Sequence, residues 1–429
     1  MVDLSAENKA LCFQDSVEKP LTVAIYDLVD NPDIEGDTYY KIVKRITGEQ
    51  IISESMQFNE GIVDSNTFEF GTFVLPQMII QWADEGERYL GKYCVVYQKI
   101  GTEYVIYMQG FVEKEKFTDN RRAISATISS LSSERLNSNC ASVYNSYAVG
   151  TEITFADFIG TLIGSDVAPF FLDIEKTKTN FPFFNAGKFK IISGVERILL
   201  SELLSFIGNA LGAHIKISKH KFTNETEFLN TPQLFFTDEI EFIRIDNVIN
   251  MVYPSQALYS SSNLFPLLSQ ISKNPIYELP YYISVDYDDL PNTAYACYRV
   301  KRLSSETGTT VASWQNIWAN PAGQFNATPA YEFDMTICEN AFEALFWGGT
   351  SGTESSFIYQ VVRKICPYLL NSKYVVANLD YTYAPFLEPG DNIRVTTTDG
   401  RTIIIPILNC SVSGINALRA TVSSEITSN

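Results

Sequence analysis

The sequence is poor in the residues and motifs that mark enzymes. Histidine, the usual acid–base side chain near neutral pH, occurs only twice in 429 residues, as His214 and His220. No HExxH, Walker GK[ST] or GxGxxG motif is present. The GxSxG elbow of hydrolases is also missing, because the nearest match, GGTSG at Gly348–Gly352, has threonine at the nucleophile position. We expect no enzymatic activity and no catalytic residues, and we interpret both histidines as packed or surface side chains.

Positive charge is scarce as well. The chain has 32 Lys and Arg against 50 Asp and Glu, a formal net charge of −18. Binding to nucleic-acid phosphates needs clustered Lys and Arg, so the composition argues against a nucleic-acid-binding surface. It argues equally against attachment to anionic membranes. An acidic surface favours solubility and repels polyanions.

Cysteine pairs with metal-binding spacing are missing. The seven cysteines are scattered without a CxxC pair, and their number is odd. Several lie in apolar runs, such as Cys94 in KYCVVY and Cys297 in AYACYRV. This pattern is typical of buried, reduced thiols and fits assembly in a cytosol. We expect no disulfide framework, no metal and no cofactor.

Long apolar segments are missing too. The most apolar one, Ile198–Ile217, is a poor candidate for a membrane span, because polar residues interrupt it at Ser201, Glu202, Asn209 and His214. The N-terminal sequence MVDLSAENKALCFQDSVEKP has neither the basic start nor the apolar core of a signal peptide. We expect a protein made without export, with residues 1–20 as a loosely held polar arm.

What the sequence does contain is strand patterns and aromatic residues. Its 28 Phe and 24 Tyr suit either a β-rich core or a large protein interface, and both interpretations stay open. Short alternating segments follow one another closely in the first part of the chain and predict a β-barrel or sandwich. They cover residues 21–28, 37–46, 50–56, 60–82, 89–99, 103–112 and 122–129.

Helical periodicity begins after Gly150. Thr154 is a predicted N-cap, followed by apolar residues at helical spacing (Phe155, Phe158, Ile159 and Leu162). The clearest helix pattern follows in residues 193–212, with Ser193 and Glu196 as a capping box and Gly212 after its last turn. The predicted buried stripe of this helix is Leu199, Leu203, Phe206, Ile207 and Ala210.

Short strands complete this predicted α+β module. One runs from His214 to Ile217, and another lies near Gln233–Thr237. The region 238–355 shows further strand patterns, and its Ser-, Thr-, Asn- and Gly-rich stretch Ser304–Thr328 predicts a long loop. Phe357–Leu370 predicts a helix that Pro367 ends or kinks.

The last part of the chain predicts a complete antiparallel unit. Val375–Tyr383 alternates as a strand, and Pro389-Gly390 predicts a type II turn. Asp399-Gly400 predicts the tip of a hairpin with arms Ile393–Thr397 and Thr402–Leu408. A final strand is predicted at Ala417–Ser423.

Three segments, in this order, resemble phage tail-hub proteins. The first is Glu60–Trp82 (EGIVDSNTFEFGTFVLPQMIIQW) with the strands that follow it up to residue 130, which resembles the N-terminal barrel of the family. The second is the predicted helix segment SGVERILLSELLSFIGNALGAHIKI, and the third is FLEPGDNIRVTTTDGRTIIIPILNCSVSG. The most specific piece is Leu387-Glu388-Pro389-Gly390-Asp391, whereas residues 240–350 do not follow the family pattern.

The resemblance implies a mainly β, α+β chain with two β-barrel-like domains joined by α+β insertions. The expected domains are a first barrel-like domain at 1–148, an α+β module at 149–237, a middle domain or insertion at 238–355, and a helix with the second barrel-like domain at 356–429. Within this family, the chain resembles the N-terminal hub region of tail-associated lysins. The sequence ends at Asn429, without the hydrolase extension of many relatives, so no lysin activity is carried over.

The function implied is that of a baseplate or tail-tip hub, a structural virion protein assembled in the host cytoplasm. Such hubs are homotrimers that close the tail tube and adapt its sixfold symmetry to a threefold tip. The implied partners are the tail tube or distal tail protein ring, the tape-measure protein, and tip spike or fibre proteins. Viral DNA would pass an acidic channel during genome ejection without specific binding, and no membrane span is implied.

Two other functions stay open. A receptor- or carbohydrate-binding tail module could use Trp314 and Trp318 in SWQNIWAN as stacking platforms, although core or interface anchors are the simpler interpretation. A cell-wall hydrolase would need a pair of carboxylates across a cleft, which no motif nominates. Asp286, Asp288 and Asp289 could coordinate calcium, but they lack the glycine and distal glutamate of an EF-hand and fit a solvated turn.

Overall fold

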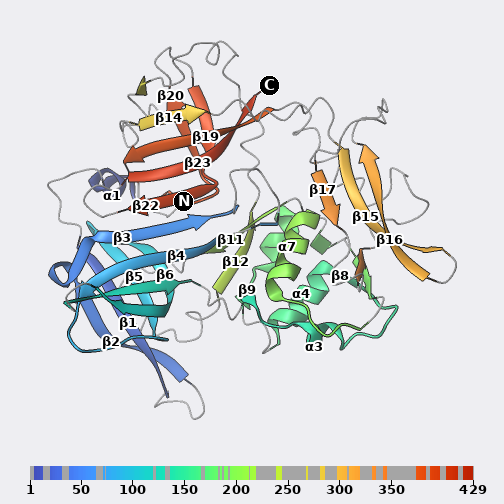
Figure 1. Cartoon of the computed structure of the whole chain (residues 1–429), viewed down its shortest axis with the longest axis horizontal. Helices are drawn as coiled ribbons and strands as arrows, with labels where there is room; N and C mark the ends of the chain where they lie inside the picture. The colour runs from blue at the N-terminus through green and yellow to red at the C-terminus, as the bar shows by residue number, and fades with distance from the viewer. Residues whose placement is uncertain are drawn as a thin grey trace.

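The computed structural model is mainly β with a few short helices and one large antiparallel sheet (Figure 1). This confirms the predicted mainly β, α+β class. The structure describes residues 4–12, 20–30, 38–63, 71–72, 74–118, 122–130, 136–165, 170–181, 184–185, 188–191, 194–211, 213–218, 238–243, 267–268, 281–285, 297–306, 309–318, 331–334, 342–344, 373–382, 387–396, 402–413 and 419–428.

The first part of the chain forms a curled antiparallel sheet with the strand order β3-β4-β7-β6-β5-β1-β2, here called the first β-unit. The predicted strands are confirmed where the structure describes them, except that Tyr89–Lys92 forms a turn before β5. Residues 64–70 and 73 of the predicted segment 60–82 lie outside the described residues. The bounds are β1 Leu21–Asp30, β2 Thr38–Thr47, β3 Ile51–Gly61, β4 Val74–Ala83, β5 Tyr93–Ile100, β6 Glu103–Phe117 and β7 Ala123–Ser129.

The first β-unit curls far enough to bring its ends together. The short helix η1 (Gly48–Gln50) connects β2 directly to β3, although these strands lie at opposite ends of the strand order. Glu85, in the loop after β4, accepts hydrogen bonds from Lys44 of β2 and from Gln50 of η1. These contacts across the open side make the unit barrel-like.

The core of the first β-unit is apolar and aromatic. Val23, Ile25 and Phe58 are among its fully buried side chains. Strands β1 and β5 are buried on both faces, because Tyr26 and Tyr93 form a second cluster on the other face. Part of the aromatic content therefore serves core packing.

The N-terminal segment differs from the prediction of a loose arm. Residues Ala6–Leu11 form helix α1, capped by the side chain of Ser5. Glu103, at the start of β6, accepts hydrogen bonds from the backbone N–H and hydroxyl of Ser5 (both 3.0 Å) and from the Asn8 amide. The arm prediction was wrong for residues 4–12 because a polar helix can still be held by specific hydrogen bonds and by its few buried side chains.

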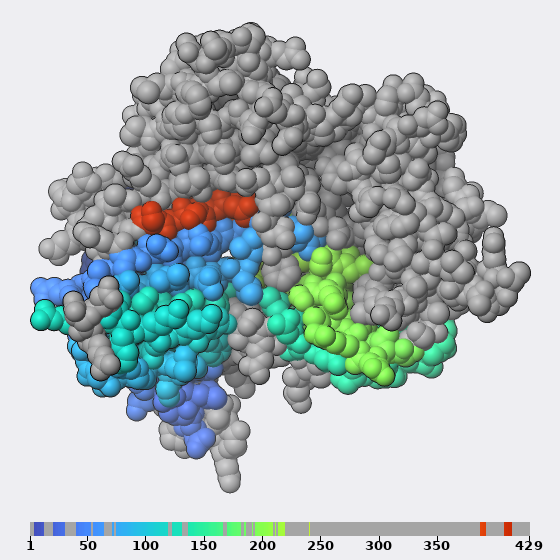
Figure 2. Space-filling view, in the orientation of Figure 1, coloured from blue at the N-terminus to red at the C-terminus, as the bar shows by residue number. Residues whose placement is uncertain are grey.

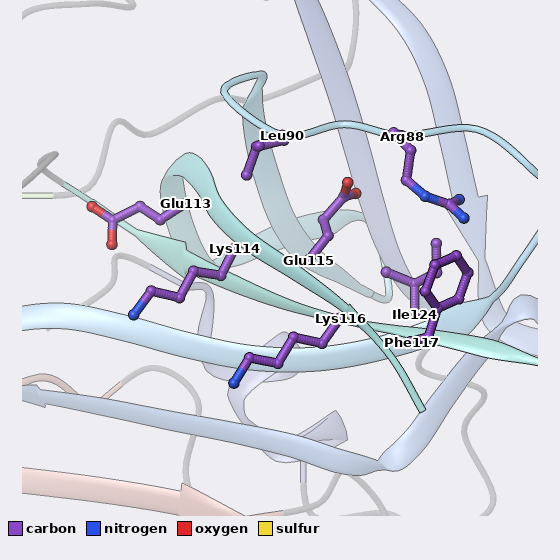
Figure 3. A pocket seen from close by; sticks show the side chains of 8 residues that line it. All are labelled: Arg88, Leu90, Glu113, Lys114, Glu115, Lys116, Phe117 and Ile124. Atoms are coloured by element: carbon purple, nitrogen blue, oxygen red, sulfur yellow. The ribbon is translucent and has the colours of Figure 1, made fainter. Parts of the chain in front are cut away.

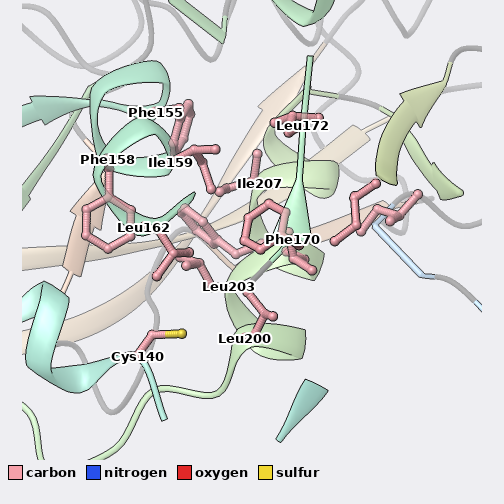
Figure 4. Close-up of a cluster of buried hydrophobic side chains, with 14 of the residues drawn as sticks. Cys140, Phe155, Phe158, Ile159, Leu162, Phe170, Leu172, Leu200, Leu203 and Ile207 are labelled. Carbon is pink, nitrogen blue, oxygen red and sulfur yellow. The ribbon is translucent and has the colours of Figure 1, made fainter. Parts of the chain in front are cut away.

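The described helices of the α+β module pack around an apolar cluster rich in phenylalanine (Figure 4). Thr154 caps helix α4 as predicted, accepting a hydrogen bond from the Asp157 N–H at 3.1 Å. The predicted stripe of α4 is fully buried. The elements are α3 Ala141–Tyr144, α4 Phe155–Ile163, α5 Ile174–Asn180, α7 Leu200–Leu211, β8 Glu152–Thr154, β9 Phe170–Phe171, β10 Lys188–Ile191, β11 His214–Ser218 and β12 Asp238–Ile243.

Helix α7 begins later than the capping-box pattern predicts. Asn145 exchanges two hydrogen bonds with the backbone of Val195, and Asn139 accepts one from the Ile198 N–H and donates one to the Glu196 carbonyl. These side chains hold residues 195–198 outside the helix. The helix starts at Leu200, where the Glu202 carboxylate accepts the Leu199 N–H at 3.0 Å.

The last part of the chain continues the sheet of the first part. Strand β22 pairs with β3 on one side and with β23 on the other, which gives a sheet of twelve strands among the described residues. Figure 2 shows this strip of the C-terminal chain lying along the first β-unit. The remaining strands of this sheet are β13 Leu267–Leu268, β14 Tyr281–Val285, β19 Lys373–Thr382, β22 Asn409–Ser413 and β23 Arg419–Ser428.

The described strands outside this large sheet form four smaller sheets, one of which pairs Phe342–Ala344 (β18) with β10 of the α+β module. The predicted hairpin is present as β20 (Asn392–Thr396) and β21 (Thr402–Pro406), and its predicted tip lies outside the described residues. The predicted loop at Ser304–Thr328 is wrong for much of its length, because β15 pairs with β16 along ten residues each. The bounds are β15 Cys297–Glu306, β16 Thr309–Trp318, β17 Tyr331–Asp334 and β18 Phe342–Ala344.

The reason for this difference is that the polar composition of the segment hid its alternation and its cross-strand partners. The predicted helix Phe357–Leu370 and the predicted strand at Gln233–Thr237 lie outside the described residues. No helix within the described ranges is long and apolar enough to cross a membrane.

Candidate functional site

Among the described residues, the candidate site is a junction where the first β-unit, the α+β module and the C-terminal turn meet. Its turn spans Glu388–Asp391. The Asp391 N–H donates to the Glu388 carbonyl at 3.0 Å, and the Asp391 carboxylate accepts the Glu388 N–H at 3.0 Å. Gly390 has φ +96°, which glycine adopts without steric cost, so the predicted turn is confirmed.

Backbone hydrogen bonds connect the turn to Ile407, which lies between strands β21 and β22. The Gly390 N–H donates to the Ile407 carbonyl at 2.7 Å, and the Ile407 N–H donates to the Asp391 carbonyl at 2.8 Å. Leu387 and Pro389 are buried beside it. These hydrogen bonds therefore hold the backbone that carries the Glu388 carboxylate in one position.

Glu388 accepts a hydrogen bond from Lys216 of strand β11. The Lys216 Nζ lies 3.0 Å from the Glu388 Oε2, and the two side chains are only 15% and 11% exposed. The partners are 172 residues apart in the sequence. This ion pair connects the α+β module directly to the C-terminal turn.

Two further carboxylates act on Lys216. Glu60, on β3, is buried in the first β-unit, and Asp391 comes from the turn itself. Burial lowers the pKa of the Lys216 ammonium, but the charges of Glu388, Glu60 and Asp391 raise it by more, so its pKa lies above the ordinary 10.5. Lys216 is therefore protonated at neutral pH, which suits an ion pair and excludes a role as a general base.

Glycines allow the backbones to approach closely at the same junction. A Cβ on Gly208 of α7 would lie 2.8 Å from the Gly71 Cα, and the Gly71 N–H donates to the Ala213 carbonyl at 2.9 Å. Gly61, at the end of β3, lies against Asn409 of β22, and the next residue, Ile62, donates to the Leu408 carbonyl at 2.8 Å. The first β-unit thus contacts both the module and the C-terminal strands here.

The junction brings together the three segments that carry the family resemblance. Gly71 belongs to the first segment, Gly208 to the helix segment and Glu388 to the last. Sequence reasoning singled out the turn of the last segment but missed Lys216 and Glu60. In the sequence, Lys216 lies between the apolar residues Ile215 and Ile217 of a short strand. This pattern does not identify the residue with which the lysine pairs.

Comparisons with known proteins give matches among solved structures only. No protein-family model and no curated protein matches this chain. The chain is similar to a tail protein from Neisseria meningitidis (TM-score 0.44, 9% identity, covering 94% of this chain and 96% of that one).

Two further structures match over a similar share of the chain. One is a prophage tail protein from Listeria monocytogenes (TM-score 0.44, 9% identity, 94% of each chain). The other is a 43 kDa tail protein of a Shewanella oneidensis prophage (TM-score 0.39, 11% identity, 95% of this chain and 98% of that one). Identities this low leave function to be inferred from the residues of this chain.

The structure describes one of the two histidines. His214, on β11, is buried, and burial lowers the pKa of its imidazole to about 3, so the ring is neutral at physiological pH. This agrees with the interpretation of a packed side chain. His220 lies outside the described residues.

The cysteines that the structure describes with their side chains are buried, as predicted (Cys12, Cys94, Cys140 and Cys410). Burial raises the pKa of the Cys94 thiol, and it raises the pKa of Cys140 to about 11. Cys297 lies on β15, and Cys338 and Cys366 lie outside the described residues. The thiols of Cys94 and Cys140 therefore stay protonated at neutral pH.

The other singled-out residues form no site in the described ranges. Asp286, Asp288 and Asp289 and the GGTSG stretch at Gly348–Gly352 lie outside them. Trp314 and Trp318 lie on strand β16, opposite Lys301 and Cys297 of β15. Within the described part of the chain, no group of three or more His, Cys, Asp or Glu side chains is placed to hold a metal ion.

A second feature is an open cleft of about 470 Å³ at one end of the first β-unit (Figure 3). Strand β6 has a β-bulge at Glu113, after which Lys114 and Lys116 alternate with Glu115 and Phe117 along the cleft. Phe117 pairs with the buried Ile124 and lies 4.5 Å below the Arg88 guanidinium, measured to the ring centre. Figure 3 shows Lys114 and Lys116 extending side by side, away from this group.

Proposed function

We propose that this chain is a structural hub subunit of a phage tail tip or baseplate, or of a tail-derived particle. In this role it closes the tail tube and adapts the sixfold tube to a threefold tip as a homotrimer. The work is mechanical, and no enzymatic step is assigned to it. The proposal includes a virion location with assembly in the host cytoplasm.

The observation that carries the proposal is the convergence of the resembling segments at the junction. The pairing of β3 with β22 makes the first β-unit and the C-terminal strands one sheet. The Lys216–Glu388 pair and the Gly71–Gly208 approach attach the α+β module to it. A subunit that presents two β-units to its neighbours needs them held at a fixed angle, and this arrangement supplies that.

The proposed domains are 1–148, 149–237, 238–355 and 356–429, with strands β13 and β14 of the third region contributing to the sheet of the last. The proposed partners are further copies of the chain, the tail tube or distal tail protein ring, the tape-measure protein, and spike or fibre proteins. With a net charge of −18, an acidic channel wall would let DNA pass without specific binding.

The test is the mass of the purified chain in solution, by light scattering after size exclusion, followed by negative-stain imaging. A hub predicts three times the chain mass of 48.2 kDa and ring-shaped particles. A monomer at all concentrations, together with degradation of purified cell walls, would contradict the proposal and favour a hydrolase. A monomer that binds a glycan array, with binding lost in Trp314→Ala, would favour a carbohydrate-binding tail module.

A further inference from the structure

Helix α1 docks on the first β-unit through a narrow stripe of side chains. Leu4, Asn8 and Cys12 recur at a spacing of four residues and are buried, whereas Ala6 and Ala10 on the opposite side are exposed. Only one of the three buried side chains is a large hydrocarbon. Burial of apolar surface alone therefore holds α1 weakly, and its polar contacts matter for the docking.

The polar contacts converge on one carboxylate oxygen. The Glu103 Oε2, at the start of β6, accepts hydrogen bonds from the Ser5 N–H and the Ser5 hydroxyl, each at 3.0 Å, and from the Asn8 side-chain amide. The Ser5 hydroxyl also caps α1, because it accepts the Asn8 N–H at 3.3 Å. One acceptor atom therefore holds both the start of the helix and its buried face.

The turn between β5 and β6, on which α1 lies, has no room for a side chain at Gly101. The residue has φ +58°, and a Cβ built on it would overlap the Asn8 Oδ1 and lie 2.9 Å from the Leu11 Cδ1. Glycine thus allows α1 to approach the backbone of the turn. A side chain at this position would push the helix away.

Cys12 lies at the end of the buried stripe and is covered when α1 is docked. Its side chain is 6% exposed. It lies near Tyr107 of β6, where burial raises the pKa of the tyrosine hydroxyl and Cys12 raises it further. Strands β5 and β6 pair with each other from Tyr93 to Phe111, so this pairing does not depend on α1. Accessibility of the Cys12 thiol therefore reports whether the helix is docked.

We propose that α1 is a releasable latch, held closed by the Glu103 carboxylate, that opens as a unit while strands β5 and β6 stay paired. Opening uncovers the Cys12 thiol and the turn beneath the helix. Segments with few buried apolar contacts open at a lower free energy than the whole chain unfolds, which fits a helix with this stripe. Opening of α1 does not depend on the proposed trimer.

Acid should release the latch, because a neutral carboxyl accepts hydrogen bonds more weakly than a carboxylate. The hydrogen bond from Asn8 lowers the pKa of Glu103 below its ordinary 4.5. Burial opposes this effect, and the hydrogen bonds from Ser5 and the charge of Lys9 lower the pKa further. The stability that Glu103 contributes to docking is therefore fully present above about pH 4.5 and is lost as the pH falls through the lowered pKa.

Other charged groups lie on both elements of the contact. Lys9 is on α1, and Lys99, next to Glu103 in the register of β5 and β6, has its ammonium 5.7 Å from the centre of the Tyr104 ring. Both lysines keep their charge in acid. Glu7, also on α1, is exposed and serves below as a control.

The test is the rate at which 4,4′-dithiodipyridine, which reacts with thiols in acid as well as at neutral pH, labels Cys12 in the full chain. Peptide mass spectrometry assigns the labelled sites, and each rate is divided by the rate for the chain unfolded in urea at the same pH. Between neutral pH and a pH below the Glu103 pKa, labelling of Cys12 should accelerate by about tenfold or more. Cys94, fully buried on β5, should stay unlabelled.

Three variants test the role of Glu103 at neutral pH. Glu103→Gln resembles the protonated carboxyl, so Cys12 should be labelled about tenfold faster and the pH dependence should disappear. Gly101→Ala displaces α1 without a change of charge and should also speed labelling. Glu7→Gln makes the same change of charge on an exposed side chain of the same helix, and it should alter the rate by less than about twofold.

Three outcomes would overturn the latch. Simultaneous labelling of Cys12 and Cys94 would mean that α1 opens only when the first β-unit unfolds. Equal rates for the wild type and Glu103→Gln would mean that this carboxylate does not hold the helix. An equal acceleration in Glu7→Gln and Glu103→Gln would assign the effect to the net charge of α1 and not to the contact.

Discussion

The junction and the cleft both gather charged side chains around apolar ones, but they differ in burial. At the junction, Lys216 and Glu388 are 15% and 11% exposed, and each has its partner within the chain. At the cleft, Arg88 is 40% exposed and the neighbouring lysines face solvent. A buried charge without a partner costs free energy. The junction therefore favours the arrangement in which the α+β module contacts the C-terminal turn. Exposed charge costs little free energy, so the charged side chains of the cleft need no buried partner within the chain.

The largest effect is expected from breaking the buried pair. Lys216→Met removes the cation and leaves Glu388 and Glu60 buried among carboxylates. We expect the free energy of unfolding to fall by about 3–5 kcal/mol, measured by urea denaturation.

An exposed pair provides the control. Lys178 and Glu175 of α5 lie 2.8 Å apart with side chains 33% and 83% exposed, so Lys178→Met should cost only about 0.2–1 kcal/mol. The double variant Lys216→Met/Glu388→Leu should recover about 1–3 kcal/mol of the loss. Equal costs for the two single variants would contradict the assignment of Lys216 to a buried junction.

The next largest effect on the free energy of unfolding is expected at the contact between Gly208 and Gly71. Gly208→Ala places a Cβ 2.8 Å from the Gly71 Cα, and because both are backbone positions something must shift. We expect a loss of about 1–3 kcal/mol, despite the better helix propensity of alanine.

Gly160 of α4 is the matched site, since its Cβ would meet only the Ile174 side chain, at 3.8 Å. Gly160→Ala should stabilise the chain by about 0.5–1 kcal/mol. If both alanines stabilise in thermal unfolding, the helix does not approach the first β-unit at Gly208.

Alkaline pH should weaken the junction selectively. The pKa of Lys216 is raised above its ordinary 10.5 in the folded chain. The stability that this group contributes is therefore fully present below about pH 10.5 and is lost as the pH rises through the raised pKa. The difference in unfolding free energy between wild type and Lys216→Met should shrink across this range, and a constant difference would contradict an ion pair.

The smallest effect on stability is expected at the cleft. Leu90 is 61% exposed, so Leu90→Ser should change the free energy of unfolding by less than about 0.5 kcal/mol. A large loss of stability in urea denaturation would mean that Leu90 packs against the rest of the chain.

Local signals explain which elements could be predicted. The strands of the first β-unit, the Thr154 cap and the Pro389-Gly390 turn depend on neighbours a few residues away. The start of α7 could not be predicted in this way, because Asn139 and Asn145, which lie 59 and 50 residues upstream of their partners, hydrogen-bond to the backbone that precedes the helix. The hairpin at β15 and β16 was missed because its composition resembles that of a loop.

The sequence by itself determined the mainly β class, the buried thiols and the phrase around Glu388 that resembles tail hubs. Only the tertiary structure decided that β22 pairs with β3 and that Lys216 is the partner of Glu388, 172 residues away. The physical reason is that strand edges and ion-pair partners are chosen by packing of distant segments, and periodicity carries no information about that choice.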